Sequence, residues 1–324
     1  MKSLCVVHGF AYWAWIVAGV VAAADKLELA YKADSGPMQV EISQRLVLKD
    51  AKRNKELQLR ISFPKETGPF PVVVWSHGAG GSKDNYTPLV EHWASHGYVV
   101  IQPTHSDSRS LAAKFSDPVF FGDWQSRPAD ISFILDSISE IETIEPAVQG
   151  RLDAKRVGVG GHSFGANTAQ LIGGAKAVVR GEEKSFVDAR ARAVMLLSGQ
   201  GPGEMLTEKS WMAFEKPMLV VSGSADGPTR TGQPAEWRKR PYELSPAGDK
   251  YLVWVEGLDH GYGGITGWNF NPKNKPNADH VRYTKIVTLA FWDAYLKSSQ
   301  EAREYLKSDK LTRHSEGAVH LDHK

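Results

Sequence analysis

The amino-acid sequence predicts an α/β protein built on a mostly parallel, twisted sheet with helices on both faces. Short continuous runs rich in β-branched residues, such as residues 71–75, are typical of strands buried on both faces. Amphipathic stretches with helical periodicity separate these runs, and parallel strands require such crossover connections. Residues 156–171 predict a strand, a sharp turn and a helix in direct succession, and the other elements are organised around them.

The first 24 residues are typical of an export signal that is cleaved. Lys2 precedes an apolar run over residues 4–21, and alanines at 22–24 supply a small-residue cleavage site. The run approaches the length that spans a bilayer, so an uncleaved anchor is the alternative. We expect a periplasmic or secreted protein with no stable membrane span after cleavage. The sole cysteine, Cys5, lies in this segment, which leaves the mature chain without a thiol nucleophile or a Cys-rich zinc site.

Residues 25–299 are predicted to form one domain, because no repeat or Pro/Gly linker divides them. Residues 300–324 are polar and charged and predict a C-terminal tail that is partly helical at most. A net charge of +2 is too small to indicate a nucleic-acid partner, and basic clusters such as residues 238–240 are interpreted as solvated faces. The oligomeric state is not predicted.

The elements of the first half follow from local pattern. Residues 57–63 alternate apolar and polar side chains before Pro64, which predicts an antiparallel strand near a sheet edge. Residues 71–75 and 98–101 predict buried strands, and Gly97 ends the helix between them. The apolar stripe of that helix has the spacing i, i+3, i+4 and i+7 and consists of Tyr86, Leu89, Val90 and Trp93.

The second half continues the alternation. Residues 106–125 are polar and irregular and predict a functional loop, after which Pro128 is expected to open a helix at its first position. The sequence predicts further buried strands at residues 157–159, 193–197, 218–221 and 252–255. An apolar stripe over residues 283–294 predicts a long C-terminal helix.

Residues 161–165, Gly-His-Ser-Phe-Gly, match the pattern G-x-S-x-G between a strand and a helix, which is the context of a nucleophile elbow. Gly161 and Gly165 permit a turn so tight that a Cβ at either position would strike the neighbouring strand or helix. Ser163 is expected to have φ above zero, with its Oγ beside the helix N-terminus, where developing negative charge is favoured. The alternative is that the pentapeptide is a chance Gly/Ser turn. Whether a base and an orienting acid follow in the sequence decides between the two interpretations.

A serine nucleophile needs a base and an acid that orients the base, and after such an elbow they follow in the order Asp/Glu, then His. Asp226 follows the strand at 218–221 and His260 follows the strand at 252–255, so both lie at the carboxyl edge of the sheet. We predict that Asp226 is the acid and His260 is the base. Asp259 is the competing acid but is expected to anchor a turn, and the alternative for His260 is a structural histidine.

An oxyanion hole is predicted where residues 76–81, Ser-His-Gly-Ala-Gly-Gly, follow the early buried strand. The expected donors are the backbone N–H groups of Phe164 and Ala79, with Gly78 or Gly80 as alternatives to Ala79. His77 and His162 are expected to shape the two turns rather than to act as the base.

Further candidates for the substrate pocket are Gly78, Gly80, His105, Trp124, Tyr262 and Trp268. The alternative roles are turn capping for His105 and core packing for the aromatic residues. His92 and His96 are four residues apart on a predicted helix, but no third ligand accompanies them. A solvated face is the expected role of these two histidines. Hydrolysis by a Ser-His-Asp triad needs neither a metal nor an organic cofactor, and none is expected.

With these motifs in place, nearly all of the mature sequence resembles the α/β-hydrolase superfamily. The stretches VVVWSHGAGGSKDNY, YVVIQPTH, GHSFGA and the late DHG resemble the branch of platelet-activating factor acetylhydrolases, dienelactone-hydrolase-like proteins and chlorophyllases. The resemblance implies the α/β-hydrolase fold over a catalytic domain at residues 25–299 and ester hydrolysis through an acyl-enzyme on Ser163. True dienelactone hydrolases use a cysteine at the position of Ser163, so this departure argues against their substrate.

The expected function is that of a serine carboxylic-ester hydrolase that acts on a small-molecule or lipid-like ester with a short acyl group or a small alcohol. No insertion resembles a lipase lid, which disfavours bulky triacylglycerol, although the loop at residues 266–279 is long enough to cover a pocket. The alternatives are an amide or peptide hydrolase with the same triad and a non-catalytic homologue used for binding.

Overall fold

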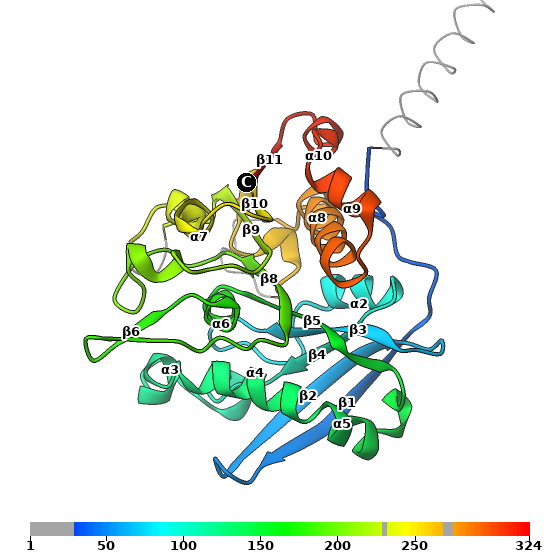
Figure 1. Ribbon diagram of the computed structural model, residues 1–324, viewed down its shortest axis with the longest axis vertical. Coiled ribbons are helices and arrows are strands. Elements are labelled where there is room, and N and C mark those ends of the chain that lie inside the picture. Colours follow the sequence, from blue (N-terminus) through cyan, green and yellow to red (C-terminus); the bar gives the residue numbers. More distant parts are fainter. Residues whose placement is uncertain (1–28, 229–231, 268–274) are drawn as a thin grey trace, which may run out of the picture.

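The computed structural model describes residues 29–228, 232–267 and 275–324. Within them, nine strands form one sheet in the order β1-β2-β4-β3-β5-β8-β9-β10-β11 (Figure 1). The neighbouring pairs from β4 to β10 are parallel, and the pairs at the two edges of the sheet are antiparallel. The strands are β1 (Val40–Asp50), β2 (Lys55–Pro64), β3 (Phe70–Ser76), β4 (Val99–Pro103), β5 (Leu152–His162), β8 (Ala191–Leu197), β9 (Met218–Ala225), β10 (Lys250–Asp259) and β11 (Val319–His323).

Helices cover both faces of this sheet (Figure 1). They are α2 (Thr87–Ser95), α3 (Pro118–Gly122), α4 (Ser126–Asp136), α5 (Ile138–Ile144), α6 (Phe164–Gly173), α7 (Arg240–Leu244), α8 (Ala278–Leu296), α9 (Gln300–Leu306) and α10 (Lys310–His314). A hairpin of β6 (Ala177–Val179) and β7 (Glu182–Lys184) lies apart from the main sheet. The predicted class, a mostly parallel sheet with helices on both faces, is confirmed.

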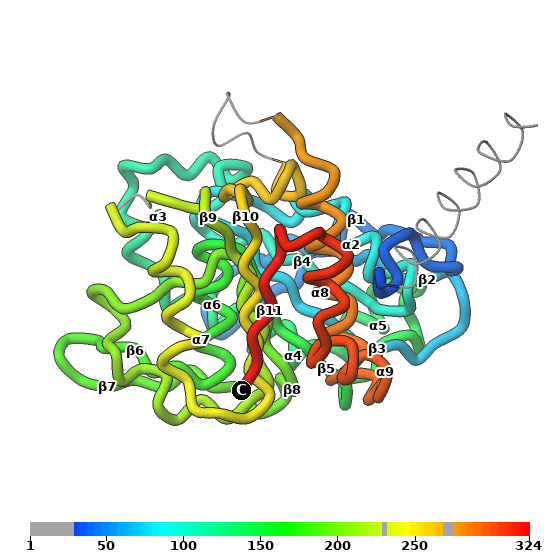
Figure 2. Tube along the Cα trace, turned by 90° about the horizontal axis from the view of Figure 1, so that it is seen from above, coloured from blue at the N-terminus to red at the C-terminus, as the bar shows by residue number. Residues whose placement is uncertain are grey.

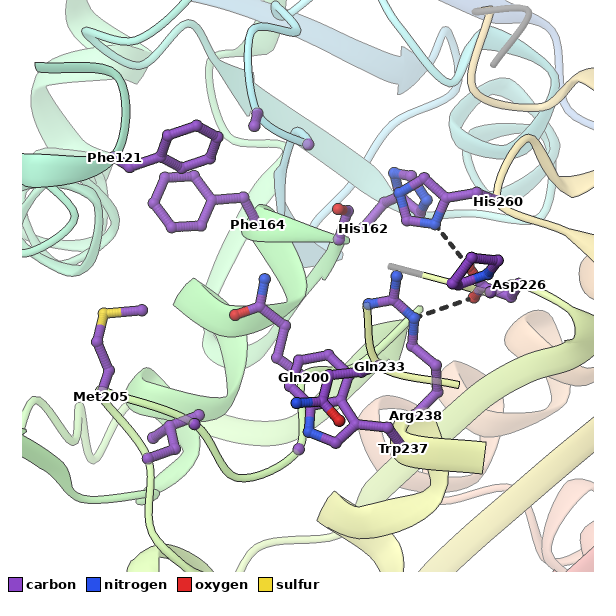
Figure 3. A pocket seen from close by; sticks show the side chains of 18 of the residues that line it. Phe121, His162, Phe164, Gln200, Met205, Asp226, Gln233, Trp237, Arg238 and His260 are labelled. Atoms are coloured by element: carbon purple, nitrogen blue, oxygen red, sulfur yellow. Dashed lines mark hydrogen bonds and ion pairs between the residues drawn. The ribbon is translucent and has the colours of Figure 1, made fainter. Parts of the chain in front are cut away.

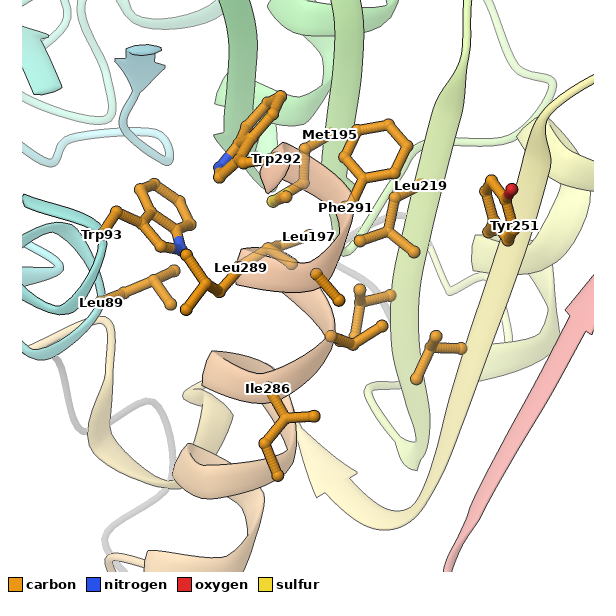
Figure 4. Packing of buried hydrophobic residues seen from close by; sticks show 14 of the residues in the cluster. Leu89, Trp93, Met195, Leu197, Leu219, Tyr251, Ile286, Leu289, Phe291 and Trp292 are labelled. Carbon is orange, nitrogen blue, oxygen red and sulfur yellow. The ribbon is translucent and has the colours of Figure 1, made fainter. Parts of the chain in front are cut away.

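Two apolar layers hold the helices on the sheet, because successive residues of a strand point to opposite faces. In β3, Val73 and Trp75 pack with α2, α8 and α9, whereas Val72 and Val74 pack with α4, α5 and α6. Figure 4 shows the first layer, where Trp292 of α8 lies above the strands beside side chains of α2. Its ring crosses β5 at Gly158, where an added Cβ would lie 2.6 Å from the indole.

Every strand predicted by the sequence overlaps a strand of the structure, and all lie fully within it except the one predicted at 98–101, because β4 begins one residue later, at Val99. The predicted antiparallel strand at 57–63 is β2, which is second from the edge because β1 pairs outside it. Pro128 is the third residue of α4 rather than the first, since the helix begins at Ser126. The predicted loop 106–125 contains the short helix α3.

The C-terminal residues 300–324 form structure where a mainly unstructured tail was predicted. They fold into α9, α10 and β11, and β11 pairs antiparallel with β10, with Val319 opposite Val255 (Figure 2). The segment looks polar because each short element buries only one to three side chains. Those that anchor it are Ala302, Leu306, Leu311 and Val319, all 0% exposed.

In the described ranges, we find no helix that is both long enough and apolar enough to cross a membrane. The predicted signal segment, residues 1–24, lies outside the described residues.

Candidate active site

Ser163 occupies the turn between β5 and α6. Its φ is 55° and its ψ is −115°, a backbone conformation that residues other than glycine rarely adopt. Its N–H donates to the carbonyl oxygen of Leu197 (2.9 Å). The glycines on either side permit this turn. A Cβ on Gly161 would lie 2.3 Å from backbone atoms of Gly165, and a Cβ on Gly165 would lie 2.0 Å from the Ser76 carbonyl oxygen. The structure therefore has the strained elbow geometry that the pentapeptide predicts.

The structure brings Ser163, Asp226 and His260 to a single cavity. Asp226 follows the end of β9 and His260 follows the end of β10, and Nδ1 of His260 lies 2.7 Å from Oδ1 of Asp226 (Figure 3). The imidazole is held by a buried carboxylate, as the base of a triad requires. Asp259 has the turn-anchoring contact predicted for it, because its carboxylate accepts from the N–H of Gly261 (3.0 Å).

Asp226 is surrounded by donors. Its second oxygen accepts from the hydroxyls of Ser198 and Ser222, and Nε of Arg238 lies 3.5 Å from it (Figure 3). Burial of this carboxyl opposes ionisation, but the charges of Arg238 and His260 outweigh it and hold the pKa of Asp226 well below its usual range. Asp226 is therefore ionised at neutral pH and is able to stabilise an imidazolium on His260.

Arg238 is a residue of the site that the sequence interpretation missed. The cluster at residues 238–240 was expected to be solvated, but the Arg238 side chain is 6% exposed and lines the cavity. Its Nη1 donates to the carbonyl oxygen of Ser198 (3.0 Å). Nothing in the local pattern of three basic residues indicates which of them turns inward. The carboxylate that Arg238 faces belongs to Asp226, which follows the end of β9.

The loop that follows β3 shows which backbone N–H groups are available to an oxyanion. The Gly78 N–H donates to the hydroxyl of Tyr86 (2.9 Å), and the Gly80 N–H donates to Oδ2 of Asp107 (3.0 Å). The Ala79 N–H has no acceptor within the part of the chain that the structure describes, and Ala79 lines the cavity. This arrangement favours Ala79 over the two glycines.

His77 and His162 have the turn-shaping contacts predicted for them. Nδ1 of His77 donates to the Gly78 carbonyl oxygen (2.7 Å), and Nδ1 of His162 lies 3.0 Å from the Tyr86 hydroxyl. Burial, reinforced by neighbouring positive charge, lowers the pKa of both imidazoles well below the usual range. Both rings are therefore neutral at neutral pH.

His105 is not a pocket residue, which corrects one expectation. It is fully buried behind the loop, with Nε2 2.9 Å from Oγ of Ser76 and Nδ1 2.8 Å from Oδ2 of Asp130. Burial, together with the charge of Arg127, lowers the pKa of His105 to about 4. This Ser-His-Asp set resembles a triad in its contacts, but its three side chains are sealed from solvent and fasten the base of the loop.

The cavity has a volume of about 1150 Å³. Some of the other residues predicted to line the pocket do so, and others do not. Gly78 and Trp124 line it, whereas Gly80 and Tyr262 do not. Tyr262 is fully buried and donates to the carbonyl oxygen of Val221 (2.7 Å), so its predicted pocket role is replaced by core packing. Trp268 lies outside the described residues.

Loops contribute most of the wall. The sequence interpretation named none of the following residues, although the loop predicted to be functional at residues 106–125 carries the first two. They include Phe115, Phe121, Gln200, Met205, Leu206, Gln233 and Trp237. Figure 3 shows an aromatic side formed by Phe121 and Phe164, whose ring centroids are 5.6 Å apart, across the cavity from Trp237. No periodicity marks these positions, because loops and short helices that follow separate strand ends supply them.

Among the residues that the structure describes, no group of three or more His, Cys, Asp or Glu side chains is arranged to hold a metal ion.

Comparison with known proteins supports the fold. Residues 31–180 match the model of the chlorophyllase family. A stretch of 56 residues is 36% identical to a putative phospholipase A2 of Schizosaccharomyces pombe; it is 17% of this chain and only 13% of that protein. The solved ferulic acid esterase of Streptomyces cinnamoneus has the same fold, with a TM-score of 0.60 and 20% identity over 88% of this chain and 96% of that one. The chain thus has the α/β-hydrolase fold.

Proposed function

We propose that this α/β-hydrolase-fold chain is a serine carboxylic-ester hydrolase that acts through an acyl-enzyme on Ser163. The observation that carries the proposal is the 2.7 Å contact between His260 and Asp226 at the cavity that Ser163 also lines. The names of the similar proteins, a chlorophyllase family, a putative phospholipase A2 and a ferulic acid esterase, all favour ester substrates.

In this mechanism, Nε2 of His260 takes the proton of Ser163 as Oγ attacks the ester carbonyl. The N–H groups of Ala79 and Phe164 donate to the oxyanion, each contributing about 3 to 4 kcal/mol of transition-state stabilisation. Asp226 accepts from Nδ1 of His260, fixes its tautomer and stabilises the imidazolium. His260 then protonates the leaving alkoxide, and a water molecule repeats the sequence to release the acid.

The test is the hydrolysis of p-nitrophenyl acetate by the wild-type chain and by Ser163→Ala. We expect kcat to fall at least about 1,000-fold in the variant, because the remaining oxyanion hole and substrate binding supply only residual catalysis. A fluorophosphonate should label the wild-type chain and not the variant. Full activity in Ser163→Ala would overturn the proposal, and faster cleavage of p-nitroanilides than of matched esters would favour the amide-hydrolase alternative.

We also propose that the substrates are small-molecule or lipid-like esters with a short acyl group or a small alcohol. A cavity of about 1150 Å³ is ample for such molecules, and its aromatic side suits apolar groups. A panel of esters that varies acyl length and alcohol bulk separately tests this, and a preference for long-chain triacylglycerol would contradict it.

Export through residues 1–24 remains a proposal that rests on the sequence alone. N-terminal sequencing of the protein from its natural source would test it, with Asp25 as the expected first residue.

A further inference from the structure

Arg127 is a buried cation beside the loop that carries Ala79. It lies in the first turn of α4 and is 1% exposed. Its Nε and Nη2 donate to the two oxygens of Asp107 (2.9 and 2.8 Å), which is the bidentate geometry of a strong charge-assisted pair. The reaction steps given above make no use of either residue.

The Arg127–Asp107 pair holds both ends of the loop segment that contains Ala79. Nη1 of Arg127 donates to the carbonyl oxygen of His77 (2.6 Å), before Ala79 in the chain. Oδ2 of Asp107 accepts from the N–H of Gly80 (3.0 Å), directly after Ala79. Burial opposes ionisation of Asp107, but Arg127 outweighs it and lowers the pKa of this carboxyl to about 2, so the pair is ionised at neutral pH.

The same guanidinium also acts on the peptide group whose N–H is the predicted donor. The carbonyl of Gly78 and the N–H of Ala79 belong to one planar peptide, so the direction of the C=O fixes the direction of the N–H. That carbonyl oxygen accepts from Nδ1 of His77 (2.7 Å) and from the N–H of Gly81 (3.0 Å), and Nη2 of Arg127 lies 3.4 Å from it. These three contacts hold the direction of the carbonyl, and with it the direction of the Ala79 N–H.

Arg127 also contacts the side chain of Phe164, the residue that supplies the second predicted donor. Its guanidinium carbon lies 4.5 Å from the centroid of the Phe164 ring, in the range of a cation–π contact. The Phe164 backbone N–H starts α6 and is the other group assigned to the oxyanion. One side chain therefore touches the loop of the first donor and the residue of the second.

We propose that Arg127 is the positioning residue of the oxyanion hole. Through Asp107, the backbone of residues 77–80 and the Phe164 ring, it fixes the direction of the Ala79 N–H and its distance from the Phe164 N–H. The inference rests on the proposed function, because an oxyanion hole has meaning only if Ser163 performs acyl transfer.

The experiment uses Arg127→Lys and Asp107→Asn in the full chain, with rates expressed per site that a fluorophosphonate titrates to completion. Lys keeps the charge but cannot bind both oxygens of Asp107, so kcat per titrated site should fall about 100- to 1,000-fold, as when one oxyanion donor is lost. KM should stay within about threefold, since ground-state binding is unaffected. The inhibition constant of a trifluoromethyl ketone, which forms an oxyanion on Ser163, should rise by a factor similar to the fall in kcat. Asp107→Asn should lower kcat per site at least about tenfold.

The matched control is Tyr98→Phe, which removes a hydroxyl that donates to the buried Asp293 (2.6 Å) on the other face of the sheet. It should leave kcat per titrated site within about twofold of the wild type. A merely structural role for Arg127 would reduce the titratable fraction in Arg127→Lys while leaving kcat per site and the ketone affinity unchanged, and that result overturns the proposal. If Arg127→Lys does not fold, Asp107→Asn decides alone, and a kcat per site at the wild-type value overturns it. Failure of the proposed function would appear separately, as a wild-type chain that hydrolyses no ester and takes no label.

Discussion

Gly165 is the position where adding one methyl group should most disturb the proposed site. In Gly165→Ala the new Cβ would lie 2.0 Å from the carbonyl oxygen of Ser76, 2.5 Å from its carbonyl carbon and 2.8 Å from the carbonyl oxygen of His77. Ordinary van der Waals contacts begin near 3.4 Å. The obstructing atoms are backbone, so no side chain is able to move aside. The start of α6 and the end of β3 must separate by more than about 1 Å.

The magnitude follows from two known effects. Overpacking of a close-packed site costs about 1 to 3 kcal/mol of unfolding free energy. The same separation moves the Phe164 N–H away from the Ala79 N–H, and a displacement of about 1 Å at a reacting centre costs about 100-fold in rate. We expect Gly165→Ala to show both losses, in urea unfolding and in kcat/KM for p-nitrophenyl acetate per titrated site.

Gly203→Ala is the control for stability, because a Cβ there has nothing within 4 Å. Its unfolding free energy should stay within about 0.5 kcal/mol of the wild type. A Gly165→Ala protein with an unchanged urea midpoint and a kcat/KM within about fivefold of the wild type would refute the steric reasoning for both glycines of the elbow.

Three further outcomes are expected. Asp226→Asn should lower kcat about 10,000-fold with little change in KM, because the amide favours the wrong tautomer of His260; a loss below about tenfold in steady-state assays would contradict the triad. The pKa of Asp107 is lowered to about 2 from an ordinary 3.8, so its carboxylate adds about 2 kcal/mol of stability that is complete above about pH 5 and is lost as pH falls towards 2. The stability difference between the wild type and Asp107→Asn in urea should therefore shrink between pH 5 and pH 2.5, and a constant difference would count against the ion pair. Val319→Asp, at a fully buried site of β11, should destabilise the fold by about 3 kcal/mol or more, whereas the exposed His320→Asp should be nearly neutral in the same unfolding assay.

The parts of the fold that the sequence predicts well are those with local causes. A strand buried on both faces must be continuously apolar, so β3, β8 and β9 are recognisable without knowledge of their neighbours. The carboxyl ends of parallel strands lie at one edge, which is why the positions of Asp226 and His260 follow from chain order once the elbow is found. The prediction for the C-terminal tail, residues 300–324, is wrong because its structure has no such local cause. β11 is a short edge strand in which Val319 is buried while His320, Asp322 and His323 are exposed, and so polar a pattern does not distinguish a strand from a free end.

The supporting charges of the site have no local signature. Arg127 contacts His77 across 50 positions of the chain and Asp107 across 20, and Arg238 contacts Ser198 across 40. A lone arginine in a helix or in a basic cluster is usually solvated, and burial becomes favourable only when a carboxylate and several carbonyls from other elements meet it. The residues of the cavity wall also come from separate loops. Residue spacing in the sequence therefore predicted neither the buried arginines nor the cavity wall.

Arg127 and Arg238, the two buried arginines described at the site, differ in what they offer the reaction, and this difference decides how their variants should behave. The proposed step separates charge, with a positive charge on His260 and a negative charge on the oxyanion. Arg238 lies 3.5 Å from Asp226 and keeps that carboxylate ionised in a fully buried place, although its charge also opposes the imidazolium. Arg127 is already neutralised by Asp107, so it contributes little net field at the oxyanion and acts through the direction of its hydrogen bonds. A lysine restores charge but not direction. The charge-preserving change should therefore be nearly as damaging at Arg127 as the loss of the side chain, which is what distinguishes positioning from simple electrostatic attraction at this end of the site.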